Sequence, residues 1–363
     1  MKIIQLLHSV NRGDAVSNHA LALHQILLRE GFEASIYALH AGPGIPEDTV
    51  QPFSFLPQIT DRDAVICHAS IGSNLHYEFA GMRGRKILIF HNITPPSFFR
   101  PYSRALEVQS ASGYAQIRAL AKWVDYFMAD SVYNKECLEQ MGYRCPIDVC
   151  PVLIPFEQYD ARPNGGVLEK YSGGGWKNLL FVGRIAPNKK QEDVIRAFCC
   201  YQRDYNPRSR LFLVGSDRGM EAYRRRLDAY AAQLGLQDRV IFTGHIPFEE
   251  ILAYYRLSDL LLCMSDHEGF CVPLLEAMHF RKPIIACRAA AVPETLRDGG
   301  LLLENRDPAQ AAFQINRVLT DPELVSRMAA NQERILKDYA WEPVRERFLA
   351  CLETALRLPA RIG

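Results

Sequence analysis

The stretch HEGFCVPLLE, residues 267–276, holds two carboxylates, Glu268 and Glu276, eight positions apart (276 − 268 = 8). Two carboxylates can act as acid and base on one bond, as they do in glycoside hydrolysis. Here Glu268 lies in a loop after the apolar run DLLLCM, and Pro273 suits the first position of a helix. Glu276 then falls near the first helical turn, where the helix dipole alone favours an acid. Glu268 has no such structural reason and is the stronger candidate for chemistry.

A second candidate is the basic segment FVGRIAPNKK, residues 181–190. Arg184 follows a predicted strand, and Lys189 comes five positions later (189 − 184 = 5) in a loop that leads into a helix. Two cations and a helix N-terminus can converge on a diphosphate. The alternative is a solvated basic loop, and the position at a strand end favours the anion site. The amides of residues 269–272 also precede or begin a helix and can bind an anion.

Other strand ends carry single candidates. Gly13 follows the first predicted strand and Gly215 follows a later one. A glycine there either makes a turn or lets a ligand approach the backbone. The first loop lacks a full GxGxxG pattern, and the second strand does not end in an acid, which disfavours NAD. His91 follows the run KILIF and precedes two prolines, so it is either structural or lines a site.

Elements that would position these residues repeat along the chain. Short apolar runs alternate with helical periodicity, which indicates parallel sheets covered on both faces. We predict two Rossmann-like doubly wound α/β domains that face each other across a cleft, with ligands at the carboxyl ends of the strands. The predicted strands are residues 2–10, 34–39, 63–69, 86–92 and 123–131, then 178–183, 210–215, 239–244, 259–264 and 282–287.

Domain boundaries follow from composition. Residues 151–177 hold three prolines and five glycines, which is typical of a hinge. We predict an N-terminal domain over residues 1–155, a linker over 156–177, a C-terminal domain over 178–340, and a terminal helix over 341–363.

Overall composition excludes several classes of protein. The 363 residues have a formal net charge of +1, so nothing global demands nucleic acid as a partner. The ten cysteines form no CxxC pair and no Cys/His ligand cluster, and the first strand begins at Lys2 without a secretion signal. No apolar run approaches the ~20 residues of a membrane span. These features predict a cytoplasmic protein, with peripheral membrane contact left open.

Taken together, the second half resembles a retaining glycosyltransferase of family 4, which has the GT-B fold. The EX7E motif of that family corresponds to Glu268 and Glu276 within EGFCVPLLEAM. FVGRIAPNKK is similar to its diphosphate-binding segment, and AAAVPETLRDGGLLL to the stretch after the motif. The resemblance covers roughly residues 178–345. The first half is similar more loosely, through the glycine turn at Gly13 and the pair Phe90-His91.

The resemblance implies a role for each matched residue. Arg184 and Lys189 would bind the diphosphate of a nucleotide sugar, and Glu268 would contact the sugar hydroxyls. Glu276 would hold the ribose, and His91 would lie beside the donor sugar. The remaining donor-binding positions implied are Gly13, Gly215, Ile246, Gly269, Phe270, Cys271 and Val272, and the terminal helix would pack back on the N-terminal domain.

This sequence departs from the family at several glycines. Cys271 stands where the motif loop has its second glycine, and Phe280-Arg281 stands where a glycine usually precedes a KP or RP pair. Ala289-Ala290-Ala291 replaces a glycine-rich turn, and the first loop has one glycine where many members have two. The resemblance therefore leaves Asp14 without an assigned role.

The implied activity is hexose transfer, with retention, from a nucleotide-diphosphate sugar such as GDP-mannose or a UDP-hexose. The acceptor would be a glycan or lipid-linked hydroxyl in surface polysaccharide or lipopolysaccharide synthesis, and no metal or other cofactor is required. Basic and aromatic residues in the range 83–104 would either meet the inner face of a membrane or form a solvated surface. The alternatives are a phosphorylase, a sugar-nucleotide epimerase, and a non-catalytic nucleotide-sugar or glycan binder.

Overall fold

The computed structural model describes residues 1–46 and 48–358, which form two compact units. Unit 1 contains residues 1–97, 105–155 and the C-terminal segment from Tyr339 onward. Unit 2 contains residues 98–104 and 156–338. Residues 359–363 of the predicted terminal helix lie outside the described part of the chain.

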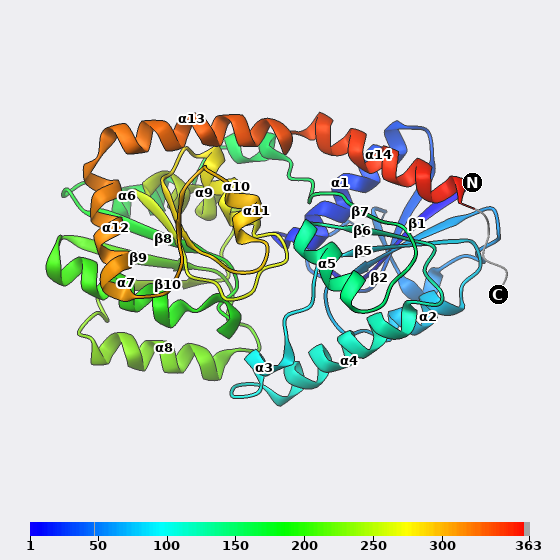
Figure 1. The fold of residues 1–363 in the computed structure, drawn as a ribbon, viewed down its shortest axis with the longest axis horizontal. Helices are drawn as coiled ribbons and strands as arrows, with labels where there is room; N and C mark the ends of the chain where they lie inside the picture. Colours follow the sequence, from blue (N-terminus) through cyan, green and yellow to red (C-terminus); the bar gives the residue numbers. More distant parts are fainter. Residues whose placement is uncertain (47, 359–363) are drawn as a thin grey trace. The chain divides into compact units, whose positions relative to one another are not determined.

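Unit 1 is built on a seven-stranded sheet in the order β3-β2-β1-β4-β5-β6-β7 (Figure 1). Each neighbouring pair is parallel, and the central strands are buried on both faces, which explains their nearly continuous apolar sequences. The strands are β1 (Lys2–Val10), β2 (Glu33–Ala41), β3 (Val50–Pro52), β4 (Ala64–Ala69), β5 (Arg85–Phe90), β6 (Tyr126–Ala129) and β7 (Ile147–Val149).

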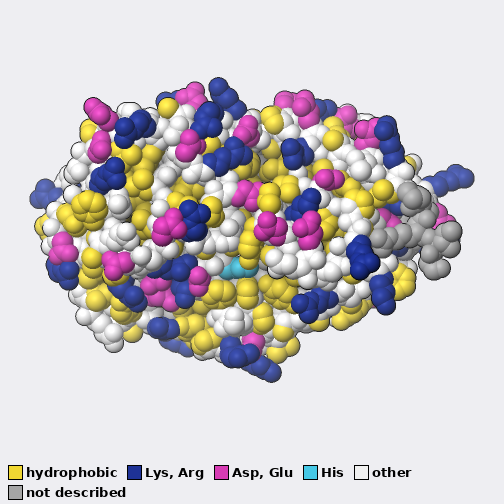
Figure 2. Space-filling model, viewed as in Figure 1, with side chains coloured by type: hydrophobic (Ala, Val, Ile, Leu, Met, Phe, Trp, Pro, Cys, Tyr) yellow, Lys and Arg dark blue, Asp and Glu magenta, His cyan; other side chains and the backbone are white. Residues whose placement is uncertain are grey.

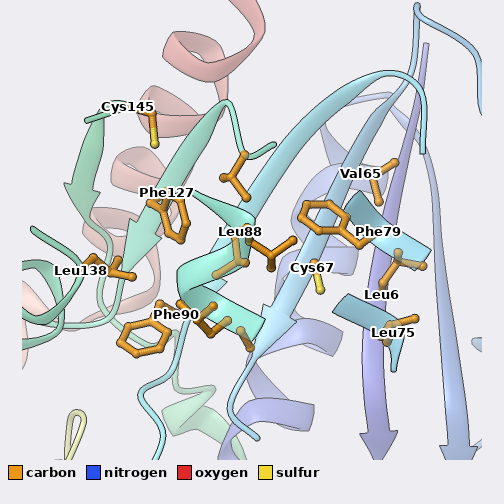
Figure 3. Packing of buried hydrophobic residues seen from close by; sticks show 14 of the residues in the cluster. Leu6, Val65, Cys67, Leu75, Phe79, Leu88, Phe90, Phe127, Leu138 and Cys145 are labelled. Carbon is orange, nitrogen blue, oxygen red and sulfur yellow. The ribbon is translucent and has the colours of Figure 1, made fainter. Parts of the chain in front are cut away.

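Helices cover both faces of this sheet. On one face, residues such as Leu88, Phe90 and Phe127 pack with Phe79 of a helix in one apolar cluster (Figure 3). The helices are α1 (Ala15–Arg29), α2 (Leu75–Gly81), α3 (Pro96–Phe99), α4 (Arg104–Leu120), α5 (Val132–Gln140) and α14 (Trp341–Arg357), with a 3-10 turn η1 (Phe53–Phe55).

The C-terminal helix α14 is part of the core of unit 1. Its residues Val344, Phe348 and Leu352 share an apolar cluster with Ile26 and Leu27 of α1. The chain therefore leaves unit 2 after Asp338 and returns to unit 1, as the resemblance implied (Figure 1).

Unit 2 repeats the same plan with a six-stranded sheet in the order β10-β9-β8-β11-β12-β13. Its strands are β8 (Lys177–Val182), β9 (Ser209–Val214), β10 (Val240–Gly244), β11 (Leu260–Cys263), β12 (Ile284–Cys287) and β13 (Leu301–Leu303).

Helices also surround the sheet of unit 2. They are η2 (Phe156–Asp160), α6 (Gly165–Tyr171), η3 (Pro187–Lys189), α7 (Gln191–Asp204), α8 (Glu221–Gln233), α9 (Phe248–Leu257), α10 (Val272–His279), α11 (Val292–Leu296), α12 (Pro308–Thr320) and α13 (Pro322–Asp338).

Three features differ from the sequence prediction. Residues 98–104, predicted as part of the N-terminal domain, group with unit 2. The strands β3, β7 and β13 were not predicted, because three residues are too few to show a period of two. Residues 156–177, predicted as a linker, carry η2 and α6 and group with unit 2. Their glycines and prolines mark turns between short helices, and the hydroxyl of Tyr159 donates a hydrogen bond to Glu276.

The surface carries both signs of charge. Lysines and arginines are interspersed with acids and apolar side chains over the face in Figure 2, in keeping with the net charge of +1. Among the described residues, no helix is long and apolar enough to cross a membrane.

Phe348 tests whether α14 is integral to unit 1. It is fully buried in the cluster with α1, so Phe348→Ala should destabilise the protein by about 3–5 kcal/mol. The matched control is Phe313→Ala on α12, because the side chain of Phe313 is 53% exposed. Denaturant unfolding measures both variants, and equal small losses would show that α14 contributes little to the core.

Candidate functional site

Lys189 and Glu268 form an ion pair within unit 2. The Lys189 ammonium lies 2.5 Å from Glu268 Oε2, and Glu268 Oε1 accepts a hydrogen bond of 2.7 Å from the Ser265 hydroxyl. Lys189 ends η3 after strand β8, and Glu268 follows strand β11. The strands β8 and β11 are parallel neighbours, so the two side chains come from adjacent carboxyl ends of the sheet.

Main-chain and side-chain contacts hold together the two loops that carry this pair. The Asn188 side chain donates to the carbonyl of His267 at 3.1 Å, and the amide of Asp266 donates to the carbonyl of Asn188 at 2.8 Å. Asp266 also pairs with Arg306 at 2.8 Å. The pair Lys189–Glu268 is thus fixed by the fold before any ligand binds.

Electrostatics keep Lys189 charged. Burial by itself would lower the pKa of the Lys189 ammonium, but the adjacent Glu268 carboxylate outweighs this, and the net pKa of Lys189 is raised. The Lys189 ammonium can therefore bind an anion, and the adjacent Glu268 carboxylate can accept a hydrogen bond from a hydroxyl group.

Arg184 lies in the same strand-end segment and is exposed. Its guanidinium donates to the carbonyl of Arg218 at 3.0 Å, which leaves further N–H donors on the guanidinium. Gly215 lies beside this segment, and a Cβ there would come within 2.1 Å of the Gly183 carbonyl oxygen. Gly215 is therefore required for strand packing, whether or not a ligand also uses it.

Glu276 has a different environment from Glu268. Its two carboxylate oxygens accept hydrogen bonds from the hydroxyls of Tyr159 at 2.6 Å and Tyr255 at 2.5 Å. Burial raises the pKa of Glu276, and the two tyrosine hydrogen bonds oppose that rise. Each oxygen keeps a second acceptor position, so the predicted ribose contact stays a prediction. Neither tyrosine was singled out from the sequence.

The loop between the two glutamates ends in a left-handed residue. Cys271 has φ of 73° and immediately precedes α10, a conformation that glycine adopts more easily than cysteine. Phe270 and Cys271 are buried, and Val272 begins the helix. The amides predicted to bind an anion thus belong to the turn that starts α10.

One group of described residues in unit 2 could hold a metal ion. Cys263, Glu268 and Cys271 each place a ligand atom within 4.8 Å of the others, and the two sulfurs are 3.9 Å apart. Lys189 occupies one oxygen of Glu268, and a cation there would have to compete with the ammonium. The arrangement favours the ammonium as the resident positive charge.

In unit 1, Gly13 and Asp14 shape the loop after β1. Gly13 has φ of 76°, and a Cβ there would meet nothing within 4 Å. Asp14 caps α1, because its carboxylate accepts from the amide and the hydroxyl of Ser17 at 2.9 and 2.7 Å. Asp14, which had no assigned role, therefore has a structural one.

His91 follows β5, but its side chain is only 3% exposed. Its Nδ1 lies 2.8 Å from Asp130 Oδ2, and its Nε2 lies 2.9 Å from Nδ1 of His68. Both ring nitrogens are engaged within unit 1, so the accessible part of His91 is its main chain. Asp130 was not among the residues predicted for a site.

The remaining predicted positions are separate from these contacts. Ile246 is half-buried in the loop between β10 and α9. Several side chains of the basic and aromatic range 83–104 have partners within their own unit: Arg83 pairs with Asp61, Arg85 with Asp125, the Lys86 ammonium donates to the Met82 carbonyl, and Tyr102 contacts the ring of Tyr223. Membrane contact by this range stays a prediction.

Comparison with known proteins bears on the fold and on unit 2. Residues 173–335 match the profile of the family described as "Glycosyl transferases group 1". A D-inositol 3-phosphate glycosyltransferase of Acidothermus cellulolyticus is 31% identical over 200 residues, which are 51% of this chain and 44% of that protein. The chain thus matches less than half the length of this relative. These matches support a glycosyltransferase family for the second half.

Solved structures are similar over nearly the whole chain. Anabaena HepE, solved with UDP-glucose, has a TM-score of 0.76 at 19% identity and covers 98% of this chain and 100% of its own. Sucrose-phosphate synthase from Thermosynechococcus elongatus has a TM-score of 0.75 at 17% identity and covers 97% and 98%. At these identities the likeness shows the fold, and it confirms the predicted class of two α/β units with parallel sheets, as in GT-B proteins.

Glu276 gives a pH-dependent prediction. Its pKa in the folded protein is raised above the ordinary value of 4.5, so stability falls as the pH rises through the folded pKa. Glu276→Gln removes this loss while keeping a carboxamide between Tyr159 and Tyr255. The variant should therefore gain stability relative to the wild type as the pH rises above the ordinary glutamate pKa of 4.5, measured by denaturant unfolding.

The control for this experiment is Glu346→Gln, an exposed residue in the middle of α14 and away from both ends of that helix. Its stability relative to the wild type should change less with pH than that of Glu276→Gln. A Glu276→Gln variant whose relative stability falls from acid to neutral pH would show that the carboxylate is favoured in the fold.

Proposed function

We propose that this protein is a retaining glycosyltransferase that moves a hexose from a nucleotide-diphosphate sugar to an acceptor hydroxyl. The pair Lys189–Glu268 at adjacent strand ends carries the proposal. It places a fixed cation, which can bind a phosphate, next to a carboxylate, which can bind sugar hydroxyls. Both groups lie at the turn that begins α10. The profile match to group 1 glycosyltransferases covers this site.

The chemical demand is the departure of a charged diphosphate. In the transfer, the bond from the anomeric carbon to the diphosphate oxygen breaks, and a bond from the same carbon to the acceptor oxygen forms. The acceptor proton passes to the departing phosphate on the same face, which retains the anomeric configuration. Lys189 and Arg184 stabilise the charge that develops on the diphosphate, with help from the N-terminus of α10. No metal is invoked in this scheme.

The two glutamates have separate duties under this proposal. Glu268, held by Lys189 and Ser265, orients the sugar hydroxyls. Glu276, held by Tyr159 and Tyr255, offers its remaining acceptor positions to ribose hydroxyls. Because the carboxylates have different partners, they are not an acid and base couple on one bond.

A UDP-hexose is the donor that we favour, since HepE was solved with UDP-glucose. GDP-mannose is the second donor to test. We place the acceptor among glycan or lipid-linked hydroxyls of surface polysaccharide synthesis, at the inner face of a membrane. A phosphorylase, an epimerase and a non-catalytic binder would share the donor site, and product analysis separates them from a transferase.

A donor screen tests the proposal directly. A bound nucleotide sugar at 100 times its Kd stabilises the folded state by about 2.7 kcal/mol, which for units of this size raises Tm by roughly 5–10 °C. We expect this shift with a UDP-hexose and a smaller one with UDP alone. If UDP-, GDP- and ADP-sugars all leave Tm unchanged at millimolar concentration, the proposal is wrong.

Lys189→Ala tests the electrostatic role. Loss of one charge that stabilises the leaving group should lower kcat by roughly 10²–10³-fold. The control is Lys337→Ala, an exposed lysine on α13 of the same unit, which should keep wild-type turnover. Turnover is measured by release of the nucleoside diphosphate with acceptor present, and an unchanged kcat in Lys189→Ala would remove Lys189 from the mechanism.

A further inference from the structure

Unit 1 contains a buried chain of four polar side chains. Asp130 Oδ2 lies 2.8 Å from Nδ1 of His91, and Nε2 of His91 lies 2.9 Å from Nδ1 of His68. Nε2 of His68 lies 2.9 Å from Oε1 of Gln5. Gln5, His68 and Asp130 are each at most 3% exposed. His68 lies near the end of β4, His91 and Asp130 directly follow β5 and β6, and Gln5 lies within β1.

The direction of this chain is fixed at Gln5. Its Nε2 lies 3.1 Å from the carbonyl oxygen of Ala20, which only accepts hydrogen bonds. The amino end of the carboxamide must therefore face Ala20, and the oxygen end must face His68, because hydrogen bonds distinguish the two ends. Since Oε1 of Gln5 only accepts, Nε2 of His68 must carry a hydrogen.

A count of hydrogens then shows that the ordinary protonation states of these side chains supply one proton too few. The chain has three contacts, from Asp130 to His91, from His91 to His68, and from His68 to Gln5. Each contact needs one hydrogen between its two heavy atoms. Two neutral imidazoles bring one hydrogen each, and an ionised Asp130 brings none. A third proton is required, or two lone pairs face each other in a buried place, which is costly.

His68 is not the place for this proton. Burial is the main cause that lowers the pKa of His68 well below its ordinary value, and a positive charge on the neighbouring His91 lowers it further. His19 is also held neutral, because its Nδ1 accepts from the amide of Leu153 at 2.8 Å. At Asp130, burial raises the pKa of the carboxyl, while the charge and hydrogen bond of His91 oppose the rise. The extra proton therefore belongs to Asp130 and His91 together.

We propose that Asp130 and His91 hold one shared proton at pH 7, and that Nε2 of His91 is a permanent donor to His68. His91 then has no free nitrogen with which to accept a proton or contact a sugar. It acts as a positioning residue that fixes the main chain after β5, where the next residue, Asn92, has φ of 71°. Asp130, through His91, is a second positioning residue for the same loop.

This assignment revises the role that the resemblance implied for His91. The geometry of the chain stands without the proposed function, whereas its effect on catalysis rests on that function. The two are tested by different measurements.

The proton is observed by nitrogen-15 and carbon-13 NMR on the full chain at pH 7. Signals of His91 are assigned from their loss in His91→Gln, and the carboxyl signal of Asp130 from its loss in Asp130→Asn. We expect Nε2 of His91 to carry a hydrogen, and either Nδ1 of His91 or the Asp130 carboxyl to carry the shared proton. An ionised Asp130 beside a His91 with a bare nitrogen would overturn the proposal.

Gln5→Leu tests whether Gln5 sets the direction of the hydrogen bonds in this chain of side chains. Without the Gln5 acceptor, the chain keeps two contacts, which two neutral imidazoles satisfy. His91 should then carry its hydrogen on Nδ1 and leave Nε2 bare, the reverse of the wild type. A Nε2 that stays protonated in folded Gln5→Leu would show that Gln5 does not set the direction. His24→Gln, a buried histidine on α1 outside the chain, is the control and should leave the His91 signals in place.

Asp130→Asn covers the case in which Gln5→Leu does not fold. Its amino group brings the third hydrogen permanently, so Nδ1 of His91 becomes a bare acceptor while Nε2 keeps its hydrogen. Transfer by Asp130→Asn should stay within about threefold of the wild type, and Asp130→Leu should lose more than tenfold in kcat with donor KM unchanged. Equal activity of Asn and Leu variants would show that the hydrogen bond does not position the loop. If the wild type transfers no sugar, the proposed function fails, and the NMR result still decides the proton.

Discussion

The ion pair between Lys189 and Glu268 is the interaction on which the rest of the candidate site depends. Both groups are largely withdrawn from water, with side-chain exposures of 22% and 8%. Removing one partner from such a pair typically costs about 3–5 kcal/mol, because a buried charge is left uncompensated. Hydrogen bonds from Asn188 and Ser265 hold the two loops in place, so that each charge keeps its partner. A buried pair is weak evidence for stability alone, and its position at two adjacent strand ends indicates function.

Local patterns in the sequence predicted the architecture but not the contacts. Long apolar runs such as the first strand were recognisable because central parallel strands are buried on both faces. The order of motifs also placed Lys189 and Glu268 at strand ends, since the carboxyl edge follows from the alternation of strands and helices. No local pattern in the sequence shows that β8 and β11 are neighbours. Lys189 and Glu268, which follow these two strands, are 79 positions apart. Their pairing depends on packing of the whole sheet.

Long-range partners are where sequence reasoning stopped. Tyr159 lies 117 positions from Glu276, in a segment whose glycines and prolines predict a linker. Its ring also packs against Phe248 and Phe280, so the segment is anchored by an aromatic cluster within unit 2. Composition predicts turns in such a segment, but it does not show that one aromatic residue is buried. Asp130 follows β6 and its partner His91 follows β5, so no local pattern links the two residues.

Three side chains near α10 stand on a left-handed backbone. Cys271, Arg281 and Ala290 have φ of 73°, 51° and 47°, a region that glycine enters more easily than other residues. A side chain in this conformation costs roughly 1–2 kcal/mol. Strain of this kind persists only where surrounding contacts fix the backbone. Those contacts are present around α10, where the Ala291 amide donates to the Glu268 carbonyl and the Thr295 hydroxyl to the Phe270 carbonyl. The left-handed backbone of Cys271 is therefore set by the contacts of the turn that leads from Glu268 into α10, the same turn that holds the Glu268 carboxylate beside Lys189.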